Sequence, residues 1–177
     1  MTDLKYLNKG KKITLEELLD RKEKRQRQID SLLDKSYSSV VIKFSLNIPG
    51  SIKNNEFIKK IFNFGLIRLK NKLSKENIPI IKSMTIDENT GPEFICQVKS
   101  SSRKLKKICV EIEEEKTGRI FDLDVETTKG AISREDLGLK PRTCFLCSEK
   151  VDICRRRKTH SLRELLRYIE DLYEGLV

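Results

Sequence analysis

The octapeptide Gly118-Arg119-Ile120-Phe121-Asp122-Leu123-Asp124-Val125 alternates apolar and acidic residues over its last five positions. Successive side chains of a β-strand point to opposite faces, so Asp122 and Asp124 would lie about 7 Å apart on one face. The apolar residues between and beside them would then anchor the opposite face in the core. The octapeptide therefore predicts a half-buried strand that presents two carboxylates on one side.

Two carboxylates on one strand face suit one or two divalent cations. Such ions neutralise phosphate charge and align the attacking and leaving oxygens in phosphoryl or nucleotidyl transfer. Asp122 and Asp124 are therefore candidate catalytic residues and candidate Mg²⁺ ligands. The alternative is that both acids only form the wet face of a surface strand, because short patterns of this kind often arise by chance.

Length and composition favour a single globular domain with an anionic partner. The 177 residues suffice for one buried core, and we expect a flexible, Lys-rich arm over residues 1–12 and one domain over residues 13–177. The formal net charge is +10. Such a balance favours nucleic acid, a phosphate-rich cofactor or an acidic protein surface as partner.

The sequence also bears on the compartment. It has no apolar run of about 18 residues, so we expect no membrane span, and its polar N-terminus lacks a secretory signal. Five cysteines, an odd number, favour a reducing cytoplasm over a disulfide framework.

Capping signals and periodicity predict an α+β domain with a mixed or antiparallel sheet flanked by helices. Capping boxes stand at Thr14–Glu17 and Ser161–Glu164. Expected helices cover residues 15–34, 55–75, 102–114 and 161–172, and expected strands cover residues 39–46, 79–86, 93–98 and the octapeptide. The polar stretch Arg21 to Gln28 is expected to be a solvated helix face, or otherwise a surface that grips a ligand.

A second constellation is Cys144-x2-Cys147-x6-Cys154-x5-His160. Thiolates and an imidazole are zinc ligands, and a CxxC pair is a common half-site. The spacing from Cys154 to His160 is not that of a standard knuckle, so two other interpretations stay open. The cysteines could be packed without metal, or His160 could contact a phosphate or act as a base.

The segment that holds this cluster is strongly basic. Residues 140–167 contain nine Lys or Arg against three Asp or Glu, and Arg155-Arg156-Arg157-Lys158 is the densest run. Arginine suits phosphate, and the N-terminus of the following helix adds free amides, so Arg155 and His160 are candidate anion ligands. A solvated face is the other interpretation. Aromatic residues are only 6% of the chain, which supplies few platforms for stacking bases.

Taken in order, the motifs of this chain resemble those of one family, the holo-acyl-carrier-protein synthases of citrate lyase, also called apo-citrate lyase phosphoribosyl-dephospho-CoA transferases. The resemblance covers roughly residues 10–172. The motifs are Thr14-Leu15-Glu16-Glu17-Leu18-Leu19, Arg21 to Gln28, Asn47-Ile48-Pro49-Gly50 with Lys53, Thr90-Gly91-Pro92-Glu93, the octapeptide, Ile132-Ser133-Arg134 with Leu137-Gly138, Arg142-Thr143-Cys144-Phe145-Leu146-Cys147, and Cys154-Arg155 to His160-Ser161 with Glu164-Leu165.

The resemblance implies an activity and two partners. Members of the family move the phosphoribosyl-dephospho-CoA group from 2′-(5″-triphosphoribosyl)-3′-dephospho-CoA to a serine of the acyl-carrier subunit of citrate lyase. Pyrophosphate leaves and a phosphodiester forms. Basic charge would suit both the phosphorylated donor and an acidic carrier protein.

On this resemblance, Asp122 and Asp124 would hold Mg²⁺, while Arg119, Arg134 and Arg142 would hold phosphates. The strand is similar to that of the polymerase-β-type nucleotidyltransferases. Their Gly-Ser signature about ten residues upstream is absent, since residues 109–113 stand in its place. Candidates for a third metal-binding carboxylate are Glu93 and Glu126.

Two other functions would fit parts of the pattern. A zinc-containing nucleic-acid-binding protein would use the cysteine cluster and the net charge of +10, and its binding would depend steeply on salt. An assembly factor would hold the carrier subunit without modifying it.

Overall fold

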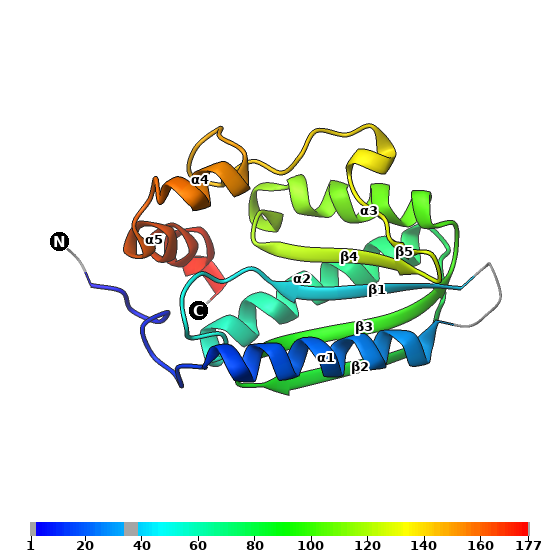
Figure 1. The fold of residues 1–177 in the computed structure, drawn as a ribbon, viewed down its shortest axis with the longest axis horizontal. Coiled ribbons are helices and arrows are strands. Elements are labelled where there is room, and N and C mark those ends of the chain that lie inside the picture. Colours follow the sequence, from blue (N-terminus) through cyan, green and yellow to red (C-terminus); the bar gives the residue numbers. More distant parts are fainter. Residues whose placement is uncertain (1–2, 34–38, 177) are drawn as a thin grey trace.

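The computed structural model describes residues 3–33 and 39–176, and over these residues the chain forms one antiparallel sheet with helices on both faces (Figure 1). The strand order is β2-β3-β1-β4-β5. The strands are β1 (Ser39–Leu46), β2 (Ile80–Glu88), β3 (Gly91–Lys99), β4 (Phe121–Thr127) and β5 (Gly130–Ala131). The helices are α1 (Leu15–Leu32), α2 (Glu56–Lys75), α3 (Ser102–Glu114), α4 (Val151–Arg157) and α5 (Leu162–Tyr173). The predicted α+β class with an antiparallel sheet is confirmed.

The two faces of the sheet are covered differently. Val40, Ile42 and Phe44 of β1 point into the main core, which α2, α3 and α5 close. Val41 points the other way, into a smaller cluster with Ile29 of α1. The strand alternation thus leaves one face under α1 partly apolar and partly polar, and this is the face on which the two aspartates lie. None of the helices in the described ranges is apolar enough over a sufficient length to cross a membrane.

Two glycines are required by close packing. A Cβ atom on Gly65 in α2 would lie 2.6 Å from Cζ of Phe44 and 2.8 Å from Cζ of Phe121, both fully buried rings. A Cβ atom on Gly118 would lie 1.7 Å from the backbone oxygen of Ile112. The missing side chain at Gly65 therefore lets α2 lie directly on the sheet, and that at Gly118 lets the chain turn tightly from α3 into β4.

The expectation of a solvated face over Arg21 to Gln28 is wrong for Arg21. This side chain is 2% exposed, and its Nε and Nη2 atoms donate to Oε2 of Glu93 on β3 at 3.1 and 2.6 Å. Arg25 donates to the same carboxylate. The reason is that α1 crosses the sheet over Glu93, so the arginines on its inner side meet a buried charge rather than water.

The described part of the N-terminal segment packs against α5. Leu7 is buried in the main core. The backbone N–H groups of Lys5, Tyr6 and Leu7 all donate to the carboxylate of Glu170, at 2.7 to 2.8 Å. The flexibility expected for residues 1–12 concerns motion and stays a prediction, as does the domain boundary at residue 13.

Candidate active site

The two aspartates of β4 lie on one face of the sheet, as the alternation predicts. Asp122 pairs across the strands with Ser45 of β1, and Asp124 pairs with Lys43. Leu123, between them, is buried in the core on the opposite face. About two fifths of each aspartate side chain is exposed, so both carboxylates are open to a ligand from solvent.

A buried lysine links the two carboxylates. The Nζ atom of Lys43 lies 2.7 Å from Oδ2 of Asp122 and 2.6 Å from Oδ2 of Asp124, and only 6% of the lysine side chain is exposed. Burial opposes the charge of Lys43, yet the two aspartates outweigh it and raise its pKa. Burial likewise opposes ionisation of Asp122, but Lys43 and Arg142 lower its pKa. The carboxylate of Asp122 is therefore held ionised beside a cation, and Asp124 contacts the same lysine.

The donor set fits a divalent metal ion. Since one ammonium nitrogen contacts an oxygen of each carboxylate, the strand geometry already lets both aspartates reach one common cation. Carboxylate oxygens are the ligands that Mg²⁺ prefers. Asp122 and Asp124 are therefore the residues on this face that could hold a divalent cation.

The two candidates for a third carboxylate differ. Glu126 continues the face of Asp124 on β4, and burial together with the charge of Asp124 raises its pKa. Glu93 lies on the same face of the sheet but is 3% exposed and is already paired with Arg21 and Arg25. Of the two, Glu126 is therefore the better placed third carboxylate, because it lies beside Asp124 while Glu93 is already neutralised by two arginines.

A cleft of about 560 Å³ opens beside the start of β4. It lies between the loop after β1, the segment before α4, and the start of α5, at the end of the sheet where α4 and α5 sit (Figure 1). No aspartate or glutamate is among the described residues that line it. The lining includes a set of basic side chains: Lys53, Arg119, Arg142, Arg155, Lys158 and His160. A pocket with this lining favours a polyanion.

Arg142 joins the cleft to the aspartates. Its Nη2 atom donates to the backbone oxygens of Arg119 and Phe121, at 2.9 and 2.5 Å. Its Nη1 atom lies 3.8 Å from Oδ1 of Asp122. The oxygen of Phe121 lies on the side of β4 that faces away from β1. The hydrogen bond to this oxygen therefore holds the Arg142 guanidinium at that edge of β4. An anion in the cleft would therefore adjoin the carboxylate pair.

The predicted phosphate ligands divide into two groups. Arg119, Arg142, Arg155 and His160 all line the cleft. Arg134 does not: its guanidinium contacts Glu113 at 2.8 Å and Glu114 at 3.1 Å, and 12% of its side chain is exposed. The structure thus gathers four of the five side chains that the sequence singled out for anions.

Two lysines at the site were not selected from the sequence as site residues. Lys43 stands in the middle of a strand of β-branched and apolar residues, and a charged residue at an inward position was the available signal. Lys53 follows the Asn47–Gly50 turn, and its Nζ atom donates to the oxygen of Ile48. Burial lowers the pKa of Lys53, and no carboxylate among the described residues offsets this effect.

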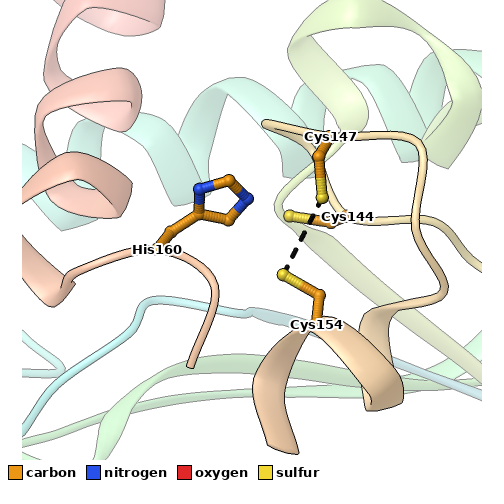
Figure 2. Close-up of side chains that lie close together, drawn as sticks. All are labelled: Cys144, Cys147, Cys154 and His160. Carbon is orange, nitrogen blue, oxygen red and sulfur yellow. Dashed lines mark hydrogen bonds between the residues drawn. The ribbon is translucent and has the colours of Figure 1, made fainter. Parts of the chain in front are cut away.

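The cysteine–histidine constellation also comes together in space. One ligand atom from each of Cys144, Cys147, Cys154 and His160 lies within 4.8 Å of all the others (Figure 2). All five cysteines of the chain are free. The cluster forms part of the cleft wall, since Cys144, Cys154 and His160 line the cleft as well. It is thus a group of side chains that could hold a metal ion.

Comparison with known proteins agrees with these features. The model of a family described as CitX, apo-citrate lyase phosphoribosyl-dephospho-CoA transferase, matches residues 13–175. Proteins with that same descriptive name from Escherichia coli O1:K1 / APEC, O139:H28 (strain E24377A / ETEC) and O8 (strain IAI1) are each 34% identical over 162 residues. Each match covers 90% of this chain and 88% of the relative. The chain belongs to the apo-citrate lyase phosphoribosyl-dephospho-CoA transferase family.

Proposed function

We propose that this protein transfers the 5′-phosphoribosyl-dephospho-CoA group from its triphosphate precursor to a serine of the apo-acyl-carrier subunit of citrate lyase. The serine oxygen attacks the phosphorus next to the ribose and loses its proton. The bond from that phosphorus to the outer phosphates breaks, pyrophosphate leaves, and a phosphodiester remains on the carrier. The family and the names of the relatives support this reaction class.

One observation carries the proposal: a cleft with basic side chains, and with no aspartate or glutamate among the described residues that line it, adjoins the Asp122–Asp124 pair through Arg142. A triphosphate carries several negative charges, which the cations of the cleft would neutralise. The reacting phosphate would then lie at the end of the cleft that faces Asp122. A pocket for a neutral substrate would not need this combination of charges.

The side chains of the chain take distinct parts in this proposal. Arg119 and Arg142 would hold phosphate oxygens, and Lys43, which contacts both Asp122 and Asp124, would keep the two carboxylates aligned. Mg²⁺, bound by the two aspartates, would neutralise charge that develops on the phosphate.

The proposal extends to the setting of the reaction. The net charge of +10 would favour docking of an acidic carrier protein. Five free cysteines suit a reducing cytoplasm. The cysteine–histidine cluster would take Zn²⁺, since soft thiolates and imidazole select that ion over Mg²⁺.

The test is incubation of the purified protein with the triphosphoribosyl donor, Mg²⁺ and apo-carrier protein, followed by intact mass of the carrier. The proposal expects a mass gain equal to the prosthetic group, mapped to one serine and dependent on all components. An assembly factor would bind the carrier without changing its mass. Steeply salt-dependent binding to nucleic acid, without carrier labelling, would favour the nucleic-acid-binding alternative, which the names of the relatives do not favour.

A further inference from the structure

Four potential metal ligands reach one point from three separate parts of the cleft wall. Cys144 and Cys147 belong to the loop before α4, Cys154 belongs to α4, and His160 lies directly before the N-cap residue of α5. Figure 2 shows the imidazole ring and the three sulfur atoms directed toward one another. All four ligands lie within residues 144–160, and they come together because the loop before α4 folds back on α4 and the chain turns again before α5.

Their spacing is that of a tetrahedral zinc site. Zinc–sulfur bonds place neighbouring sulfur atoms of a tetrahedron about 3.8 Å apart. The Sγ atoms of Cys147 and Cys154 lie 3.9 Å apart, and all four ligand atoms lie within 4.8 Å of one another. Small side-chain adjustments would complete the tetrahedron.

Within the part of the chain that the structure describes, one ring nitrogen of His160 lacks a partner that a metal ion could supply. Nε2 of His160 is buried and has no hydrogen-bond partner among the described residues. A buried polar atom without a partner destabilises a fold, so such atoms usually have a ligand. The backbone N–H of Leu146 also donates to Sγ of Cys144 at 3.4 Å, an arrangement that stabilises negative charge on that sulfur. Both features suit coordination by thiolate and neutral imidazole.

We infer that Cys144, Cys147, Cys154 and His160 bind one Zn²⁺ ion with a structural role. Four protein ligands fill the coordination sphere of zinc and leave no open position for water or substrate, unlike the three-ligand sites of zinc enzymes. The ion therefore does not activate a nucleophile. His160 is then a metal ligand, which excludes both other interpretations of this residue, as an anion ligand and as a catalytic base.

The ion fixes the cation-bearing wall of the cleft. Cys144 stands two positions after Arg142, and Cys154 stands directly before Arg155, so coordination ties both arginines to the start of α5 through His160. Without the metal, the loop and α4 are joined mainly by local contacts such as the bridge between residues 143 and 150. The inference that zinc binds is independent of the proposed function. The inferred effect of zinc on triphosphate binding, in contrast, rests on the proposed function.

Metal content tests the site directly. Protein purified without added metal is expected to contain one zinc ion per chain by elemental analysis, and Cys147→Ser is expected to lose it. Ser148→Ala, an exposed change in the same loop, is the matched control and should keep it. Cobalt(II) added to metal-depleted wild-type protein should give the intense visible absorption of tetrahedral thiolate coordination, whatever the folding of the variants. Protein with no zinc and no such cobalt spectrum, or equal zinc in Cys147→Ser, would overturn the inference.

Binding of inorganic tripolyphosphate tests the role. Calorimetry should show affinity at least about tenfold weaker for zinc-depleted protein than for the zinc-loaded form, because each lost charge-assisted contact costs more than a factor of ten. Restored zinc should restore the affinity. Equal affinity of the two forms would refute the role in shaping the cleft. Zinc content is measured without the donor or carrier, so a failure of carrier labelling would leave the metal site standing.

Discussion

Replacement of Glu93 by glutamine should destabilise the protein strongly, because it removes the charge on which α1 is held over the sheet. The carboxylate accepts from Arg21 and Arg25, and both the Glu93 and Arg21 side chains are at most 3% exposed. Removing one partner of a buried pair leaves an uncompensated charge and typically costs about 3–5 kcal/mol. The amide oxygen can still accept one bond, so we expect a loss near the lower end, about 3 kcal/mol.

Denaturant unfolding and calorimetry measure this loss. For a chain of this size, about 3 kcal/mol corresponds to a fall in Tm of roughly 6–12 °C. Glu23→Gln is the matched control, since Glu23 also pairs with an arginine, Arg27, but more than two thirds of each side chain is exposed. That control should change the free energy of unfolding by less than about 0.5 kcal/mol. Equal stability of the two variants would refute the role of the buried pair.

The same pair predicts a pH dependence. Burial favours the neutral form of Glu93, but Arg25 and Arg21 outweigh it and lower the pKa below the ordinary value of 4.5. The unfolded chain therefore takes up this proton at a higher pH than the folded chain does. The stabilisation is complete above pH 4.5 and is lost as the pH falls through the lowered pKa of the folded state. Glu93→Gln should lack this part of the acid dependence, and an unchanged acid profile would contradict the assignment.

Three further changes test individual packing and pairing statements. Gly65→Ala, which would stabilise an exposed helix by about 1 kcal/mol, should instead cost about 1–3 kcal/mol in urea unfolding, because the methyl group meets the rings of Phe44 and Phe121. Gly175→Ala, where the Cβ atom meets nothing within 4 Å, is its control, and equal behaviour would be contrary evidence. Arg134→Ala should lower stability by about 3 kcal/mol and leave tripolyphosphate affinity unchanged. If Arg134→Ala instead bound tripolyphosphate more weakly at unchanged stability, Arg134 would be a phosphate ligand after all.

The sequence predicted the local structure of this protein well where one short segment decides it. Thr14 and Ser161 cap their helices with the reciprocal hydrogen bonds of the predicted capping boxes. The alternation around Asp122 and Asp124 correctly placed both on one face, because side chains two positions apart always share a face in any β-strand. The helix α4 was not predicted, since its seven residues are too few to show an apolar period.

The sequence could not reveal which charges meet across the fold. Arg21 lies 72 positions before Glu93, and their pairing depends on the angle at which α1 crosses the sheet. Arg134 likewise looked like a phosphate ligand from its residue type, but its guanidinium donates to the carboxylate of Glu113 on α3. The place of Lys43 between two aspartates follows from the register of β1 against β4, which no local pattern specifies. Four of the five anion ligands predicted from the sequence line the cleft, and only the fold showed that Arg134 does not and that Lys53 does.

The rate of carrier labelling by Asp122→Asn tests the central claim most directly. The variant keeps the size of the side chain but removes the carboxylate of Asp122 from the shared face of β4. Asp171→Asn, an exposed change on α5, is the control. With donor, Mg²⁺ and apo-carrier protein, intact mass should show labelling at least about a hundredfold slower than wild type for Asp122→Asn and unchanged for the control, while the Tm of both stays close to wild type. Labelling by Asp122→Asn at the wild-type rate would contradict the assignment of the reaction to the aspartate pair.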